Sequence, residues 1–231
     1  MMKNPIFIAL DVNEWGKALE LAQELSPLAG GFKVGPRLSL KATPLEWQKL
    51  ADYGPIFYDP KFYDIPNTMV ESLRACADKG ISYVTIHAGS GLKAMEQVAK
   101  LEQQLNASQF FKVLDVTVLT SFDGTQNPIP GFTGTSLDDA VLTLTDLVAE
   151  SGLTGVVCAG HEVSKVKYVH PDFFTVVPGI RLKEDSTDDQ ARVLEPQKAI
   201  ELGADALVVG RSVINEANPK AKLQKYLDLL R

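Results

Sequence analysis

The sequence has little cysteine or histidine and no long apolar run. Two of its 231 residues are cysteines and three are histidines, without a Cys-x-x-Cys or His-Glu-x-x-His spacing. We therefore expect no metal site and interpret Cys76 and Cys158 as reduced core residues. The apolar runs are far shorter than the roughly 20 residues that cross a bilayer, and the segment MMKNPIFIALDV lacks a basic region and a small-residue cleavage site. We expect a cytoplasmic protein without a membrane span.

Positive charge is also scarce. The 23 Lys and Arg residues are outnumbered by 29 Asp and Glu residues, which gives a net charge of −6. Nucleic-acid binding needs a basic face, so we expect no nucleic-acid partner, and any anionic ligand must be held by a local cluster. No Gly-x-Ser-x-Gly motif is present. The segment GSGLKA, residues 89–94, resembles a dinucleotide-binding turn, but no acidic residue ends the next strand at the required offset of about 20 residues.

Apolar residues, by contrast, make up 45% of the chain and gather in eight short runs separated by segments with helical spacing. The runs are IFIALDV from Ile6, GFKVG from Gly31, PIFYDPKF from Pro55, YVTIHAG from Tyr83, KVLDVTVLT from Lys112, GVVCAG from Gly155, FTVVPGI from Phe173 or Phe174, and ALVVGRS from Ala206. Such near-continuous hydrophobicity is typical of parallel strands buried on both faces. Eight units of about 29 residues suit a (β/α)8 barrel, which needs roughly 250 residues. We predict an α/β fold, a single-domain TIM barrel over residues 1–231; a doubly wound open sheet is the alternative.

Two connections are longer than is usual. SFDGTQNPIPGFTGT, residues 121–135, follows the fifth strand, and RLKEDSTDDQARVLE, residues 181–195, follows the seventh. Both lie after the carboxyl ends of strands, where barrel enzymes build their sites. We predict that the second is a lid, and an ordinary solvated loop is the alternative for each.

The third strand ends in charged residues. Asp59 and Lys61 are two apart, so they share one face of a regular strand, while Pro60 points the opposite way. Isolated charges at the mouth of an apolar barrel would each cost several kcal/mol, so they need partners. Lys33, in the preceding strand, is positioned to place Asp59 between two lysines. A structural ion pair that ends the strand is the alternative to a functional site.

Asp64 lies beyond the end of the same strand. It precedes Ile65 and Pro66, so it is a candidate cap for the helix whose first turn holds Pro66. A functional role would require Asp64 to reach a site by a turn or from a second subunit.

The seventh and eighth strands each end in glycine and arginine. The segments are PGIR, which ends at Arg181, and VVGRS, which contains Gly210 and Arg211. Loops after these two strands form the recurrent phosphate site of barrels, where a glycine lets backbone N–H groups approach an anion and an arginine supplies a forked cation. We predict a phosphate ligand, with surface salt bridges of the arginines as the alternative.

Together, these segments resemble the orotidine 5'-phosphate decarboxylase family over nearly the whole chain. The matching segments, in order, are ALDV, KVG, DPKFYDIPNT, VTVLTS, PGIR and VVGRS. The most specific part is the Asp-x-Lys-x-x-Asp-Ile-Pro-Asn-Thr block together with Lys33. The chain departs from the bacterial pattern at Pro60, Tyr63 and Ser212.

The resemblance implies a homodimer that converts orotidine 5'-monophosphate to UMP and carbon dioxide in pyrimidine biosynthesis, without metal or organic cofactor. It implies that Lys61 stabilises and protonates a carbanion at C6. The implied catalytic residues are Lys33, Asp59 and Lys61 of one subunit and Asp64 of the other. The implied substrate contacts are Asp11 and Lys33 at the ribose, Thr120 at the pyrimidine, Gln190, Gly210 and Arg211 at the phosphate, Thr68 at the partner's ligand, and also Ile65 and Arg181.

Two other functions compete with this interpretation. A magnesium-dependent keto-sugar-phosphate decarboxylase or synthase of the same superfamily shares the Asp-x-Lys-x-x-Asp block, but it has an acidic metal ligand at the position of Lys33. A non-catalytic sensor of phosphate ligands would need the Gly-Arg segments but has no use for Lys61 beside Asp59.

Overall fold

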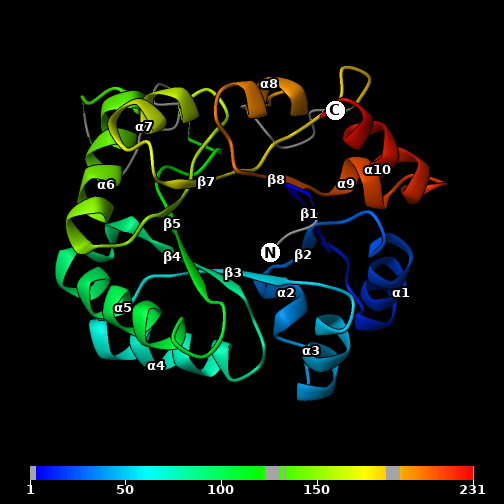
Figure 1. Cartoon of the computed structure of the whole chain (residues 1–231), viewed down its shortest axis with the longest axis horizontal. Coiled ribbons are helices and arrows are strands. Elements are labelled where there is room, and N and C mark those ends of the chain that lie inside the picture. The colour runs from blue at the N-terminus through cyan, green and yellow to red at the C-terminus, as the bar shows by residue number, and fades with distance from the viewer. Residues whose placement is uncertain (1–3, 123–130, 133, 186–192, 231) are drawn as a thin grey trace.

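The computed structural model describes residues 4–122, 131–132, 134–185 and 193–230. Eight parallel strands pair in sequence order, and β8 pairs with β1 to close a barrel that helices surround (Figure 1). The strands are β1 (Ile6–Ala9), β2 (Gly31–Val34), β3 (Ile56–Phe62), β4 (Tyr83–His87), β5 (Lys112–Val116), β6 (Gly155–Val157), β7 (Phe174–Val177) and β8 (Ala206–Val209). The predicted TIM barrel is confirmed, and the open-sheet alternative is wrong because the first and last strands are hydrogen-bonded neighbours. The assignment of residues 1–231 to one domain stays a prediction.

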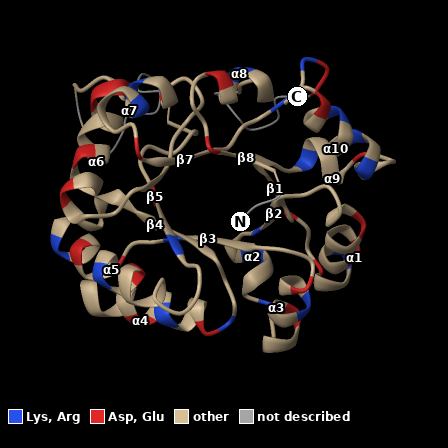
Figure 2. Cartoon of the chain, in the orientation of Figure 1, with Lys and Arg blue, Asp and Glu red and all other residues tan. Residues whose placement is uncertain are grey.

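The connecting segments form helices with recognisable start signals. They are α1 (Trp15–Leu25), α2 (Pro36–Ser39), α3 (Pro44–Ala51), α4 (Pro66–Ala77), the 3-10 helix η1 (Ala88–Ser90), α5 (Leu92–Leu105), α6 (Leu137–Ser151), α7 (Val163–Val169), α8 (Pro196–Glu201), α9 (Arg211–Ile214) and α10 (Pro219–Asp228). Five of them begin with proline, whose fixed φ suits the first helical position. Acidic and basic residues are interspersed along these outer helices (Figure 2). No helix in the described ranges is both long and apolar enough to span a bilayer.

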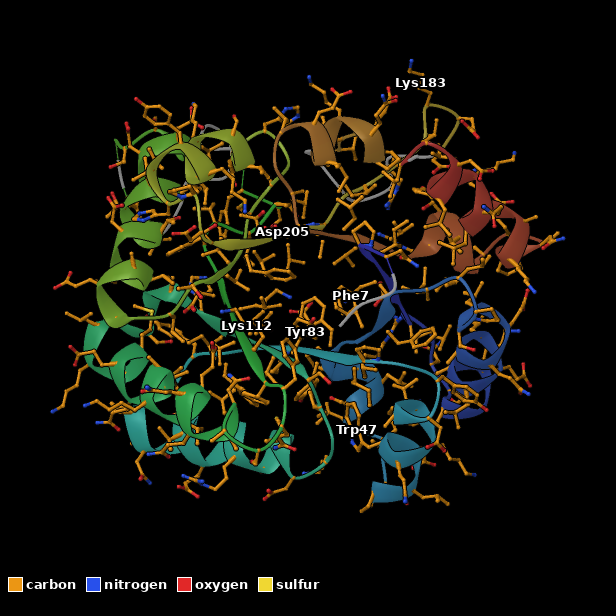
Figure 3. The ribbon with its side chains drawn as sticks, viewed as in Figure 1. Phe7, Trp47, Tyr83, Lys112, Lys183 and Asp205 are labelled. Carbon is orange, nitrogen blue, oxygen red and sulfur yellow. The ribbon has the colours of Figure 1, made fainter. Side chains whose placement is uncertain are left out.

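The apolar residues form two layers, one inside the barrel and one between the strands and the helices. Inside, Phe7 packs edge-on against Tyr83 with ring centroids 5.0 Å apart (Figure 3). Phe57 and Leu114 belong to the same buried cluster. Burying each such side chain stabilises the fold by roughly 1.5–3 kcal/mol. This packing fills the barrel interior, so a ligand has room at the carboxyl ends of the strands rather than through the centre.

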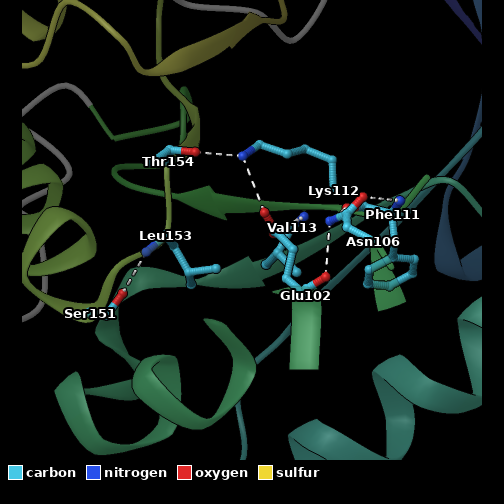
Figure 4. A network of polar contacts seen from close by, with 8 residues as sticks. All are labelled: Glu102, Asn106, Phe111, Lys112, Val113, Ser151, Leu153 and Thr154. Carbon is cyan, nitrogen blue, oxygen red and sulfur yellow. Dashed lines mark hydrogen bonds and ion pairs between the residues drawn. The ribbon is translucent and has the colours of Figure 1, made fainter. Parts of the chain in front are cut away.

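Partly buried polar contacts join the amino-terminal end of β5 to its neighbours. Glu102 on α5 accepts hydrogen bonds from the Lys112 ammonium at 3.2 Å and from the Val113 N–H at 2.7 Å, and Lys112 also bonds Thr154 at 2.6 Å (Figure 4). These contacts lie at the end of the barrel away from the predicted site. In barrels, this end contributes to stability rather than to catalysis.

Candidate active site

The end of β3 is not a regular strand. Its pairing with β4 shifts register between Tyr58 and Phe62, and Lys61 has a φ of 51°, in the left-handed region. We expected Asp59 and Lys61 to share one face of a regularly alternating strand, and this is wrong because the strand is irregular between them. Both side chains nevertheless line one pocket. A non-glycine residue in this region costs roughly 1–3 kcal/mol and typifies functional sites.

A residue from β4 holds this irregular segment. The side-chain oxygen of Thr85 accepts a hydrogen bond from the Lys61 backbone N–H at 2.9 Å and donates to Oδ1 of Asp59 at 2.8 Å. Sequence reasoning missed Thr85. The available signal was its position as the middle residue of the row Tyr83, Thr85 and His87, which faces the barrel axis in the strand next to β3.

Asp59 lies between two lysines, as predicted. Its Oδ1 is 2.9 Å from Nζ of Lys61, and its Oδ2 is 3.4 Å from Nζ of Lys33. Nζ of Lys33 also lies 3.8 Å from Oδ1 of Asp11, so the charges alternate along the mouth of the barrel. Burial raises the pKa of Asp59, but Lys33 and Lys61 outweigh burial and hold the pKa below its usual value. Asp59 is therefore a carboxylate at neutral pH.

These charges line a pocket formed by the carboxyl ends of seven strands. The site residues predicted from the sequence that line it are Asp11, Lys33, Asp59, Lys61, Thr120, Arg181, Gly210 and Arg211. The structure thus brings eight of the predicted residues together. Cys158, interpreted from the sequence as a core residue, is buried and also lines the pocket, whereas Cys76 is buried on α4.

The two Gly-Arg strand ends meet on one side of this pocket. Arg181 is buried, with 6% exposure, and its guanidinium donates to the backbone oxygen of Ile180 at 3.0 Å. A Cβ atom on Gly210 would lie 3.2 Å from Cβ of Ala9 and 3.4 Å from a carboxylate oxygen of Asp11. Glycine therefore allows β8 to approach β1 closely at the pocket, and Arg211 follows directly.

Three predicted residues lie outside the pocket of their own chain. Asp64, Ile65 and Thr68 are exposed, Ile65 to 67%. The capping interpretation of Asp64 is wrong, because Ile65 is the N-cap of α4 and Asp64 instead accepts a hydrogen bond from the Ile65 N–H at 2.7 Å. Pro66 begins the helix, as expected. Gln190 lies outside the described residues, as do residues 186–192 of the predicted lid and much of the loop after β5.

His87 borders the charged cluster. Burial and the nearby Lys61 both lower the pKa of its imidazole, so His87 is neutral at neutral pH. Its Nδ1 accepts a hydrogen bond from the Gly89 N–H at 3.0 Å. The described residues contain no group of three or more His, Cys, Asp and Glu side chains arranged to hold a metal ion.

Comparisons with known proteins agree with this geometry. Residues 4–226 match the orotidine 5'-phosphate decarboxylase / HUMPS family. A Dichelobacter nodosus protein named orotidine 5'-phosphate decarboxylase is 40% identical, with all of both chains covered. A Carboxydothermus hydrogenoformans protein of the same name is 39% identical and covers 98% of this chain and 96% of its own length.

A solved structure leads to the same family. The crystal structure of orotidine 5'-phosphate decarboxylase from Lactobacillus acidophilus is 29% identical, with a TM-score of 0.84 over 99% of this chain and 100% of that one. The resemblance stated from the sequence is therefore confirmed, as is the expectation of an enzyme. This chain belongs to the orotidine 5'-phosphate decarboxylase / HUMPS family.

Proposed function

We propose that the protein decarboxylates orotidine 5'-monophosphate to UMP in pyrimidine biosynthesis, without a metal or organic cofactor. The observation that carries this proposal is the carboxylate of Asp59 held between the ammonium groups of Lys33 and Lys61 at the mouth of the barrel. The names of the relatives support the choice of substrate.

The reaction places an unusual demand on the site. When the bond from C6 to the carboxylate breaks, its electron pair stays on C6 in the plane of the ring, out of conjugation with the π system. Resonance cannot delocalise this charge, so the enzyme must stabilise it electrostatically. A preorganised ammonium group in a water-poor pocket provides that stabilisation, and Lys61 is the candidate.

Lys61 then completes the reaction. Its ammonium transfers a proton to C6, which forms UMP, and the resulting neutral amine takes a proton back from solvent. The hydrogen bond from Nζ to Asp59 at 2.9 Å fixes the ammonium before substrate arrives. The ionised Asp59 therefore orients the Lys61 side chain through this contact.

Other pocket residues account for the rest of the nucleotide. We assign Asp11 and Lys33 to the ribose and Thr120 to the pyrimidine. Gly210 and Arg211 hold the phosphate, together with Arg181 and with Gln190, which lies outside the described residues. Binding energy from this remote phosphate helps to organise the reacting end of the site.

The proposal includes a homodimer whose subunits share their sites. Asp64, Ile65 and Thr68 would contact the ligand of the partner subunit, because they are exposed and lie outside their own pocket. The adjacent exposed side chains of Tyr63, at 69%, and Ile65, at 67%, supply apolar surface that such an interface would bury. We further propose that this dimer works in the cytoplasm.

The magnesium-dependent alternative fits the site less well. A divalent cation would need the carboxylates of Asp11 and Asp59, but the Lys33 ammonium lies 3.8 Å from one and 3.4 Å from the other. The Lys33 ammonium neutralises the two carboxylates and would repel a divalent cation placed between them. The non-catalytic sensor leaves unexplained why Lys61 is held in a left-handed conformation beside Asp59.

The test is an absorbance assay with orotidine 5'-monophosphate, using protein treated with EDTA. We expect turnover to UMP and carbon dioxide in EDTA and no increase on adding magnesium. Turnover that requires magnesium would favour the metal-dependent branch. Binding of the nucleotide without turnover under either condition would favour the sensor.

A further inference from the structure

A second cluster of buried charge lies where the chain leaving β7 meets the C-terminal helix. The side chain of Asp185 is 3% exposed, and that of Lys222 on α10 is 9% exposed. The Lys222 ammonium bonds Oδ1 of Asp185, and the Tyr226 hydroxyl, one turn further along α10, donates to Oδ2. Both carboxylate oxygens are thus fixed by separate donors, unlike those of a solvated surface ion pair.

The surroundings keep this carboxylate ionised. Burial by itself raises the pKa of Asp185, but hydrogen bonds from Lys222 and Tyr226 outweigh it, and the pKa is below its usual value. The Leu182 N–H also donates to Oδ2 at 2.9 Å, which closes a turn just after Arg181. The segment that begins at Arg181 is therefore tied to α10 through Asp185.

The same tyrosine connects this cluster to the other arginine of the pocket. The Tyr226 hydroxyl lies 2.8 Å from Oγ of Ser212, and Ser212 follows Arg211 directly at the start of α9. One continuous polar chain thus runs from the Arg181 segment, through Asp185 and Tyr226, to the Arg211 segment. Lys222 neutralises the carboxylate at its centre.

We propose that Asp185, Lys222, Tyr226 and Ser212 form a brace that sets the spacing between Arg181 and Arg211 and thereby positions both for the phosphate of the ligand. The inference rests on the proposed function, because that function makes these two arginines phosphate ligands. The brace touches no reacting atom, so its members are positioning residues. Phosphate binding depends on the spacing because two forked cations must reach oxygens of one small anion together.

The discriminating variant is Tyr226→Phe, which removes the hydroxyl that joins the two segments and keeps the buried ring. We expect the dissociation constant of inorganic phosphate, measured by calorimetry, to rise roughly 5- to 30-fold. The KM for orotidine 5'-monophosphate should rise as well, while kcat stays within about twofold. This pattern is expected because the phosphate contacts stabilise the bound substrate and the transition state equally. Tyr168→Phe, at an 89% exposed tyrosine on α7, is the matched control and should change neither constant.

Two lysine variants test the charged centre of the brace. Lys222→Met should weaken phosphate binding as Tyr226→Phe does, because Asp185 loses its counter-ion and shifts. Lys225→Met, at an exposed position of the same helix, should not. A merely structural role would lower the melting temperature of Lys222→Met without changing the phosphate affinity of the folded protein.

The outcomes separate the brace from the proposed function. Unchanged phosphate affinity in folded Tyr226→Phe would overturn the brace, as would a wild-type protein that binds no phosphate. Wild-type protein that binds phosphate but does not decarboxylate the nucleotide would overturn the proposed function alone, and the phosphate comparison would still decide the brace. If Tyr226→Phe does not fold, Ser212→Ala removes the contact to Tyr226 alone and must show the same loss of phosphate affinity.

Discussion

Nζ of Lys61 lies 2.9 Å from Oδ1 of Asp59, although the two residues are joined by a backbone that leaves regular strand geometry at Lys61. The contact is therefore set by a strained turn of the chain and by the neighbours that hold it. A site built this way depends on groups that do not themselves line the pocket.

Thr85 is the first such group. Thr85→Val keeps the shape of the buried side chain but removes the acceptor for the Lys61 N–H and the donor to Asp59. We expect kcat to fall roughly 10- to 100-fold, which corresponds to about 1.4–3 kcal/mol lost from a buried, charge-assisted network.

A buried threonine away from the site provides the control. Thr175 on β7 is fully buried and bonds the Asp205 carboxylate at 3.0 Å. Thr175→Val should lower the melting temperature but leave kcat within about twofold. Equal losses of kcat in the two variants would mean that Thr85 acts through general stability and not through the Lys61 turn.

Asp115 on β5 predicts a pH dependence of stability. Its side chain is fully buried, and neither carboxylate oxygen has a hydrogen-bond partner among the described residues. Burial, reinforced by repulsion from Glu102, raises its pKa well above the usual value despite the nearby Lys112. In the folded protein Asp115 therefore holds its proton at pH values where the unfolded chain has lost it.

The sign follows from this difference in bound protons. Above about pH 4, Asp115 ionises in the unfolded chain but stays protonated in the folded protein, which favours the unfolded state. The free energy of unfolding therefore falls by up to roughly 1.4 kcal/mol per pH unit, until Asp115 also ionises in the folded protein. Asp115→Asn removes this term, so we expect it to raise the melting temperature at pH 8 more than at pH 5. The exposed Asp172→Asn is the control. A stability difference that does not change with pH would contradict the assignment.

Mixing two inactive variants tests the shared site. Lys61→Ala and Asp64→Asn should each be inactive alone, but a mixed dimer has one pocket with both native groups. Random pairing of equal amounts should recover roughly a quarter of wild-type activity in a two-fold symmetric dimer.

The control for mixing uses two residues of the same pocket. Lys61→Ala mixed with Asp59→Asn should recover nothing, because every pocket in the mixture lacks one native group. Recovery in neither mixture, with mixed dimers demonstrated by native mass spectrometry, would count against Asp64 as a residue of the partner's site.

Hydrophobic runs and strand-end motifs are local signals, and they predicted the barrel and the lysines, arginines and Asp59 of the pocket. Asp11 and Thr120, which also line the pocket, were expected only from the family resemblance. Sequence reasoning placed Lys33 beside Asp59 because consecutive barrel strands are neighbours, and Nζ of Lys33 lies 3.4 Å from Oδ2 of Asp59. It failed where geometry depends on tertiary contacts. The left-handed backbone at Lys61 is stabilised by Thr85 from another strand, and the two-residue alternation rule contains no information about that contact.

The cap of α4 and the brace were beyond sequence reasoning for a similar reason. Asp64 was a chemically suitable cap, but the chain enters the helix one residue later, at Ile65. Asp185 and Tyr226 are far apart in sequence, and nothing in either local pattern indicates that they meet.

In the proposed mechanism, Lys61 is held by Asp59 and carries the chemistry without a metal. The most direct test is the rate of absorbance change with orotidine 5'-monophosphate in EDTA, measured for the wild type, for Lys61→Ala and for the exposed-site control Lys100→Ala. We predict full activity for the wild type and the control, and no measurable turnover for Lys61→Ala despite an unchanged circular dichroism spectrum. Turnover at the wild-type rate by folded Lys61→Ala would rule out Lys61 as the residue that carries the chemistry.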